Sequence, residues 1–445
     1  ISLMSSSSPS PGRASADHLC VLVHGLWGHP DHLKYLTTSL REKYPEDQLH
    51  ILVAKSNTGP FTYDGIELGG ERVVNEIEET LENLTQDGHQ IKKISVVGYS
   101  LGGLINRYAI GLLYHKGWFD KIQPVNFTTF ASPHLGVRTP LLGYHNHLWN
   151  ILGARTLSVS GRQLFTIDKF RDTGRPLLAV LADPGSIFMK ALAQFQHRSL
   201  YANIINDRSA PYYTTGIVST DPFVDLDKVN IHYLPGTEDV ILDPDHPVEP
   251  KEQEAPLAFT QRLSATTRTV FGRLPMMALL AVVIPLGTTA FLFNSAIQSV
   301  RSSQRIRLHE QGKAGIDIGG YRIPLMLKNV RKEVQNMFED ANNAESQEYL
   351  PGQQETGTEQ DGPEAEFKRG AKAEQRGSDS PFPTLALTPD QFGMIQALNE
   401  VGIQKFLVHI HKHNHSHAAI IKRYEGKNMT EGRIVVKHWL DNFIL

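Results

Sequence analysis

The sequence predicts an α/β fold with a mainly parallel sheet flanked by helices. From Leu19 to about Pro222, short apolar runs alternate with amphipathic segments, as they do in successive βαβ units. The run Ile94–Gly98 is rich in β-branched residues, which is typical of a buried strand. The segment Gly70–Thr85 spaces apolar residues along one face and places glutamates on the other, as a helix packed on a sheet does.

Each further element follows from its local pattern. Strands are expected at Leu19–Val23, Leu49–Ala54, Val125–Ala131 and Tyr201–Ile205. A helix is expected over Pro30–Tyr44, because it begins with Pro and Asp, and helical pieces and loops over Leu141–Leu192 are expected to cover the top of the sheet. After Thr388 the pattern predicts a helix to Val401, then strands at Lys405–Ile410 and Ala418–Lys422.

Composition bounds the domain organisation. With 445 residues, 40% hydrophobic and 20% charged, the chain has room for one large globular domain and extra segments. A net charge of -3 argues against nucleic-acid binding, and the single cysteine, Cys20, excludes an intrachain disulfide. We expect a disordered tail at 1–16, the first part of the core at 17–260, a disordered insert rich in Glu, Gln, Gly and Ser at 333–383, and the rest of the core at 385–445.

The strand Ile94–Gly98 runs directly into a G-x-S-x-G motif centred on Ser100. In this motif the serine occupies a sharp turn between strand and helix, and the glycines leave room for the tight backbone. Helical apolar spacing follows the motif, which is the context that it requires. Ser100 is therefore the predicted nucleophile.

A serine hydroxyl needs a base, and the base needs an acid that orients it. Asp207 lies where an apolar strand gives way to a turn, which favours it as the acid over Asp183, Asp221 and Asp239.

The base is expected near the C-terminus, where five histidines alternate with other residues from His409 to His417. His417 stands just before an apolar run and is preferred to His415. Were the histidines on one strand they would share a face and could bind a metal, but Asn414 and Ser416 favour a loop. We therefore predict no metal and no cofactor.

Two backbone amides are expected to hold the oxyanion that forms during acyl transfer. One belongs to Leu101, directly after the nucleophile, and the other to the glycine-rich loop after the first strand, where Leu26 is preferred and Trp27 is next. His24 precedes the nucleophile in the chain, so we interpret it as a structural part of this loop.

Several strings together resemble one family, the lipase and serine-esterase family found in fungi and plants. They are an early H-G-x-x-G at His24, Gly98–Gly103, Phe130–Gly136, Tyr201–Asp207 and His417–Ile421. The resemblance covers about residues 17–240 and 385–440 and is nearest to the fungal branch of lipid-droplet phospholipases. It implies an α/β-hydrolase fold with Ser100, Asp207 and His417 as the triad. Tyr99 departs from the pattern, because many lipases have His there.

The segment 274–297 contains an apolar, uncharged run, Leu274–Phe293, that is long enough for a membrane span. A single crossing would put Asp207 and His417 on opposite sides of the bilayer, although both must reach Ser100. A hairpin with its turn at Pro285-Leu286-Gly287 avoids this conflict, with arms of roughly 15 Å each. The alternative is a lid or docking helix. Positive charge on both flanks favours cytosolic ends: Arg262, Arg268, Arg273, Arg301, Arg305 and Arg307.

These observations predict a serine hydrolase that cleaves ester bonds of lipids, at the cytosolic face of a membrane or lipid droplet. An acyltransferase or a soluble carboxylesterase could use the same triad. A membrane-tethered scaffold without turnover is the non-enzymatic alternative.

Overall fold

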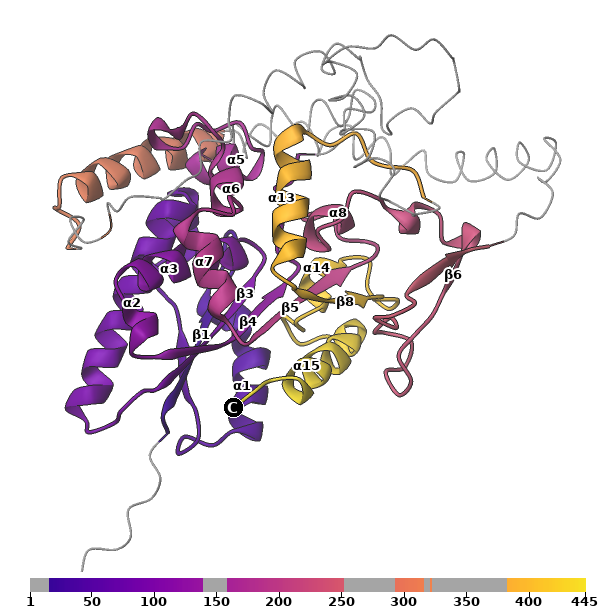
Figure 1. Ribbon diagram of the computed structural model, residues 1–445, viewed down its shortest axis with the longest axis horizontal. Coiled ribbons are helices and arrows are strands. Elements are labelled where there is room, and N and C mark those ends of the chain that lie inside the picture. The colour runs from indigo at the N-terminus through magenta and orange to yellow at the C-terminus, as the bar shows by residue number, and fades with distance from the viewer. Residues whose placement is uncertain (1–15, 139–157, 252–292, 316–320, 322–381) are drawn as a thin grey trace, which may run out of the picture.

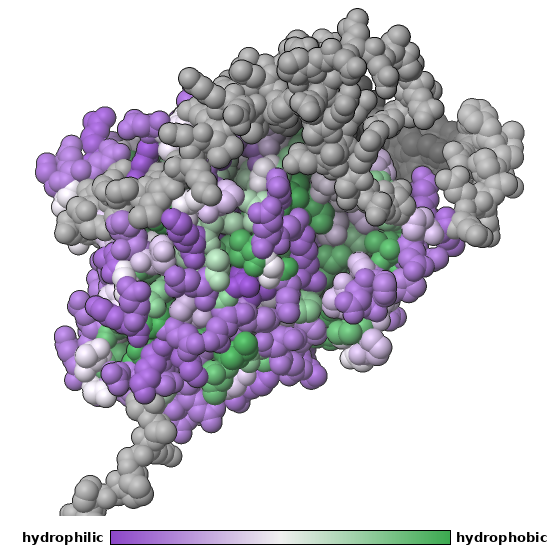
Figure 2. Space-filling view, viewed as in Figure 1, coloured by the Kyte–Doolittle hydropathy of each residue, from purple (hydrophilic) through white to green (hydrophobic). Residues whose placement is uncertain are grey.

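The computed structural model describes residues 16–138, 158–251, 293–315, 321 and 382–445 (Figure 1). Residues 1–15, 274–292 and 333–381, on which the predicted tail, apolar run and insert fall, lie outside the described residues. On the face seen in Figure 2, hydrophilic residues predominate over the described part, and apolar residues form small groups between them. Most of the large apolar side chains of the described residues are gathered in two buried clusters.

A six-stranded sheet with strand order β2-β1-β3-β4-β5-β8 forms the centre of the molecule. All five neighbouring pairs are parallel, so the predicted mainly parallel sheet is confirmed. The strands are β1 (His18–Val23), β2 (His50–Val53), β3 (Lys93–Tyr99), β4 (Gln123–Phe130), β5 (His197–Asn203) and β8 (Gln404–Val408). The strand expected at Tyr201–Ile205 thus begins four residues earlier.

Helices cover both faces of the sheet (Figure 1). Alternate side chains of β1 enter different cores: Leu19 belongs to one cluster and Cys20 to the other. The Leu19 side is covered by α2 (Ile66–Gln86), α3 (Leu101–His115) and α7 (Ile187–Gln194). The Cys20 side is covered by α1 (Lys34–Lys43) and α15 (Glu431–Asp441).

Further helices and one strand pair complete the described chain. The remaining helices are α5 (Ser158–Leu164), α6 (Leu177–Leu181), α8 (Tyr212–Thr215), α13 (Pro389–Glu400), α14 (Ser416–Ala419) and residues 293–310. The 3-10 helices are η1 (Pro30–Leu33), η2 (Gly59–Tyr63), η3 (Trp118–Asp120), η4 (Arg171–Thr173), η5 (Pro222–Val224), η6 (Leu226–Lys228) and η9 (Lys427–Met429). An antiparallel pair is formed by β6 (Val229–Ile231) and β7 (Val248–Pro250). Within the described ranges, none of the helices combines the length and apolar composition that a bilayer crossing needs.

The strand predicted at Ala418–Lys422 is wrong, because the chain there forms α14 and a turn. The apolar run Ala418–Ile421 is buried throughout, and a short buried run does not distinguish strand from helix by its periodicity. This turn packs so closely on α15 that a Cβ at Gly432 would lie 2.1 Å from the carbonyl oxygen of Ala419.

The strand order places the candidate site. The chain passes from β1 outward to β2 and then returns to β3 on the other side of β1. Helix α1 therefore lies on one face of the sheet and α2 on the opposite face. In open α/β sheets such a reversal leaves a crevice at the carboxyl ends of the two central strands, here β1 and β3. The loops that carry Leu26 and Ser100 begin at these two ends.

Candidate active site

Ser100 occupies the turn between β3 and α3, with φ 55° and ψ −125°. A side chain at positive φ is unfavourable, and this strain is typical of a nucleophile held above a sheet. The two glycines of the motif are needed for close backbone contacts. A Cβ at Gly98 would lie 2.4 Å from Gly103 Cα, and one at Gly102 would lie 2.1 Å from the carbonyl oxygen of Val23.

His417, in α14 beyond the end of β8, brings its imidazole to the serine. Its Nε2 lies 3.0 Å from Ser100 Oγ. The backbone on both sides of the ring is anchored, because Tyr99 donates its hydroxyl to the His417 carbonyl at 2.9 Å and Ser416 donates to the Ile205 carbonyl at 2.7 Å. The Tyr99 ring also packs on the imidazole, with 5.2 Å between the centroids.

The role of Tyr99 escaped the sequence analysis, which noted only its departure from the lipase pattern. Burial raises the pKa of its hydroxyl, so the group remains a proton donor over the physiological range. Its position next to Ser100 in the motif is the signal that could have revealed it, because the last residue of β3 faces the loops at the carboxyl end of the sheet.

Asp207 lies in the loop after β5, with a side chain that is 2% exposed. Its Oδ2 lies 2.8 Å from Nδ1 of His417 and accepts a second bond from Asn203 at 3.0 Å. Its Oδ1 accepts from the backbone amides of Ser209 and Ala210 at 3.0 and 2.9 Å. Burial by itself would raise the pKa of Asp207, but the imidazole and these donors outweigh it and hold the pKa below the ordinary 3.8.

The ionised carboxylate settles the tautomer of the imidazole. Because Asp207 can only accept, Nδ1 of His417 donates to it, and Nε2 is left as the acceptor that faces the hydroxyl of Ser100. The three side chains predicted from the sequence therefore come together in the arrangement that lets an imidazole take a proton from a serine.

The rival residues have other partners. Among the aspartates, Asp183 pairs with Arg175 at 2.7 Å, and Asp221 caps η5. His415 precedes α14, and its ring stacks on that of His417 at 6.4 Å between centroids. It is His417 and not His415 that bonds to both Ser100 and Asp207.

The loop after β1 lies directly against the nucleophile. A Cβ at Gly25 would be 2.7 Å from the Cβ of Ser100. The backbone amide of Trp27, at φ 53°, donates to Thr62 Oγ1 at 3.1 Å, and its indole donates to the Tyr63 hydroxyl at 2.7 Å. These bonds tie the loop to η2 and leave the amide of Trp27 unavailable to an oxyanion.

Leu26 and Leu101 retain the amides expected for the oxyanion. Leu101 is the first residue of α3, so its N–H has no acceptor within the helix. For the amide of Leu26, no hydrogen bond is formed within the described part of the chain. Between the two candidates in the loop, the engaged amide of Trp27 favours Leu26.

His24 lies inside the same loop and is buried. Its Nδ1 is 3.1 Å from the Gly25 carbonyl, and Gly28 leaves the space that the ring occupies, since a Cβ there would be 2.3 Å from Nδ1. Burial lowers the pKa of this imidazole. The ring thus fills the interior of the turn, which agrees with the interpretation of His24 as a structural residue.

A polar cavity of about 530 Å³ lies beside the acid and base loops. It is lined by Arg208, Lys412, His413, Asn414, His415 and Asn428. Because β8 ends at Val408, the five histidines do not continue as one strand. In the described ranges, no cluster of three or more His, Cys, Asp or Glu side chains is arranged to hold a metal ion.

Residues 13–221 match the family model described as "Putative serine esterase (DUF676)", and the resemblance to a serine-esterase family is confirmed there. "Putative lipase ROG1" of Saccharomyces cerevisiae is 33% identical over 210 residues, which are 46% of this chain and 29% of that protein. "Putative lipase C4A8.10" of Schizosaccharomyces pombe is 32% identical over 45% of this chain and 26% of its own length. The match therefore spans less than a third of these relatives.

Among solved structures, a "putative cell surface hydrolase" from Lactobacillus plantarum is similar in part. The similarity covers 45% of this chain and 74% of that chain, with 12% sequence identity and a TM-score of 0.27.

Proposed function

From the match of residues 13–221 to the serine-esterase family, we propose that this protein is a serine hydrolase that cleaves carboxylic ester bonds of lipids. The observation that carries the proposal is the pair of hydrogen bonds by which His417 joins Ser100 to Asp207. A fold of this kind alone would support many functions, whereas a serine, a histidine and an aspartate in this geometry can carry out acyl transfer.

The reaction proceeds through an acyl-enzyme. Ser100 Oγ attacks the ester carbonyl carbon while Nε2 of His417 takes the hydroxyl proton, and Asp207 stabilises the imidazolium. The amides of Leu26 and Leu101 hold the oxyanion. When the tetrahedral intermediate collapses, the ester bond breaks and the imidazolium gives its proton to the leaving alcohol. A water molecule, deprotonated by the same imidazole, then attacks the acyl carbonyl carbon; the bond to Ser100 Oγ breaks, the imidazolium returns its proton to Oγ, and the fatty acid leaves.

A lipid substrate is proposed on two grounds. The curated relatives are named as lipases, and the apolar run Leu274–Phe293 is suited to a membrane or droplet surface. Asp207 precedes this run and His417 follows it, yet the two side chains are bonded to each other beside Ser100. We therefore favour a hairpin that enters and leaves one face of the lipid over a complete crossing. The positive charge on both flanks of the run favours the cytosolic face. Deletion of residues 274–293 is then expected to release the protein from membranes, and an unchanged membrane fraction would contradict the topology.

Turnover of a panel of phospholipids and triacylglycerol tests the proposal, with Ser100→Ala as the blank. We expect release of fatty acid by the wild type and none above background by the variant. Addition of an acyl acceptor to the same assay separates a hydrolase from an acyltransferase, and a short water-soluble ester identifies a general carboxylesterase. Lipid or ester cleavage that survives in Ser100→Ala would overturn the proposal, and absence of Ser100-dependent cleavage would favour the scaffold.

A further inference from the structure

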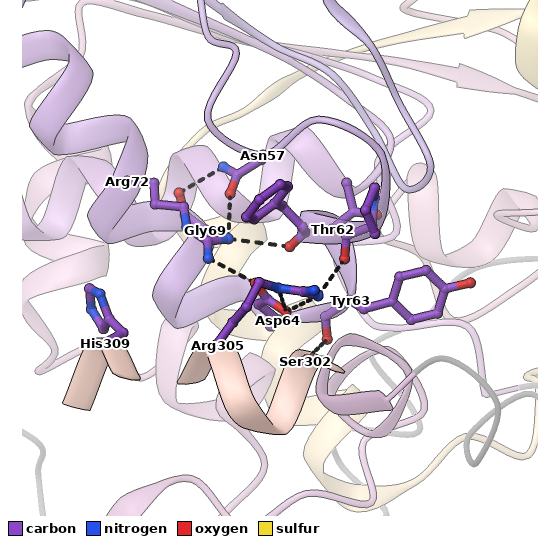
Figure 3. Close-up of polar contacts among 12 residues, drawn as sticks. Asn57, Thr62, Tyr63, Asp64, Gly69, Arg72, Ser302, Arg305 and His309 are labelled. Carbon is purple, nitrogen blue, oxygen red and sulfur yellow. Dashed lines mark hydrogen bonds and ion pairs between the residues drawn. The ribbon is translucent and has the colours of Figure 1, made fainter. Parts of the chain in front are cut away.

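The helix over residues 293–310, called here the clamped helix, lies against the domain through its polar side chains (Figure 3). Ser302 donates to the carbonyl of Tyr63 at 3.3 Å, and the imidazole of His309 is hydrogen-bonded to Glu71. The buried positions recur every seven residues, or about two helical turns, so they form one stripe. The stripe consists of Ser295, Ser302 and His309.

An ion-pair network fixes the orientation of this helix. Arg305 binds both carboxylate oxygens of Asp64, with its Nε 2.9 Å from one and its terminal nitrogen 2.7 Å from the other (Figure 3). Arg72 binds the same carboxylate at 2.8 Å, and the side chain of Asp64 is fully buried. Both guanidinium groups lie over the Phe61 ring at about 5 Å. Arg305, one of the arginines that flank the apolar run in the sequence, thus holds the helix to the domain.

The outward face of the clamped helix carries exposed apolar side chains around one polar residue, Gln304, which inverts the usual pattern of a surface helix. At 3.6 residues per turn, Phe293, Ile297 and Val300 lie on the side opposite Ser302. Two exposed arginines, Arg301 and Arg307, flank these side chains. The exposed fractions are 70% for Phe293, 37% for Ile297, 60% for Val300 and 48% for Leu308.

We propose that this outward face is a docking surface for an anionic phospholipid membrane. An apolar stripe flanked by arginines is the composition of a helix that lies in the plane of a lipid interface, with its cations at the headgroups. The helix also begins where the apolar run Leu274–Phe293 ends, so the chain that leads into it is suited to the same lipid surface. The inference deepens the proposed function. It rests on the proposal that the apolar run lies at a lipid surface.

The inward side of the clamped helix is linked to the oxyanion loop through Tyr63. The clamped helix is bonded to the carbonyl of Tyr63, and the hydroxyl of the same tyrosine accepts from Trp27 in the loop that carries Leu26. Tyr63 of η2 therefore bonds both to the helix that carries the proposed docking surface and to the loop that carries Leu26.

A fluorescent reporter on the helix tests this surface in the full chain. Cys20 is fully buried, and burial raises the pKa of its thiol, so an introduced Ile297→Cys is labelled selectively with an environment-sensitive fluorophore. Val224→Cys is the matched control, because Val224 is an equally β-branched residue, 66% exposed, in η5. Each labelled protein is mixed with phosphatidylcholine vesicles that contain phosphatidylserine, and co-sedimentation, emission wavelength and iodide quenching are measured.

On vesicle binding, we expect the label at position 297 to shift to shorter wavelength and to lose iodide quenching by roughly threefold or more, while the label at 224 changes little. Co-sedimentation with unchanged quenching at 297 would overturn the proposal, because another part of the chain would then hold the membrane. Protection of the label before vesicles are added would overturn it in favour of a protein occupant. Failure to co-sediment would also overturn it, while Ser100-dependent cleavage of a soluble ester would leave the esterase function standing.

Discussion

Two buried aspartates, Asp207 and Asp64, have different partners, and these partners give them different roles. Asp207 and Asp64 both have side chains that are almost or fully inaccessible to solvent. Asp207 faces one imidazole, which has two ring nitrogens, and the second of these lies 3.0 Å from Ser100 Oγ. Asp64 faces the guanidinium groups of Arg72 and Arg305, which offer several N–H donors and no acceptor. The comparison shows that a buried carboxylate supports proton transfer only where its partner can release the proton. Where the partners are arginines, the carboxylate holds two parts of the chain together.

The largest effect is expected at the first aspartate. Asp207→Asn removes the charge that orients and stabilises the His417 imidazolium, so kcat on a short soluble ester should fall about 10⁴-fold. Thermal unfolding of the same preparation verifies that the fold is retained. A kcat that stays within tenfold of the wild type would contradict the role of Asp207 in proton transfer.

At the second aspartate, the expected effect is on stability. Asp64→Asn leaves two partly buried guanidinium groups without their carboxylate, and the free energy of unfolding in urea should fall by about 3–5 kcal/mol. The kcat of the folded fraction should change only a few-fold. Asp245→Asn, at an exposed position, is the control and should do neither. A loss of kcat as large as that of Asp207→Asn, without loss of stability, would contradict the division of tasks.

A smaller effect on kcat distinguishes a hydrogen bond that anchors the catalytic base from an ordinary buried hydrogen bond. Tyr99→Phe removes the donor to the His417 carbonyl, and Tyr201→Phe removes a comparable bond, 2.9 Å long, to His438. Both should lower the free energy of unfolding by about 1 kcal/mol. Only Tyr99→Phe should lower kcat, by roughly fivefold, because the base loses part of its anchor. Equal kcat values for the two variants would show that Tyr99 is merely structural.

The smallest effect is on acid stability. Because the pKa of Asp207 in the folded protein lies below its ordinary 3.8, the folded state binds the proton less readily than the unfolded state does. The stabilisation is fully present above the ordinary pKa and is lost as pH falls through the folded value. Urea unfolding at a series of acidic pH values should therefore show a shallower decline in Asp207→Asn than in the wild type. If the free energy of unfolding declines with pH in parallel in the two proteins, the folded state does not stabilise Asp207 as the anion.

The triad could be predicted from the sequence, whereas the ion-pair network of Asp64 could not. Ser100 lies in a local motif, and Asp207 and His417 follow strands whose carboxyl ends meet at one edge of a parallel sheet, so topology brings them together. Asp64 and Arg305 lie 241 residues apart in the chain and belong to no motif, so only tertiary packing reveals their contact. The wrong strand at Ala418–Lys422 has a similar cause, because a fully buried apolar run carries no periodicity.

Covalent labelling by a fluorophosphonate tests the central claim most directly, because the reagent reacts with a serine whose proton is taken by a neighbouring base. Peptide mapping after brief exposure should place the label on Ser100 in the wild type. The rate should fall about 10³-fold or more in His417→Ala, and no adduct should form in Ser100→Ala. Labelling of another serine, or a rate unaffected by His417→Ala, would contradict the account.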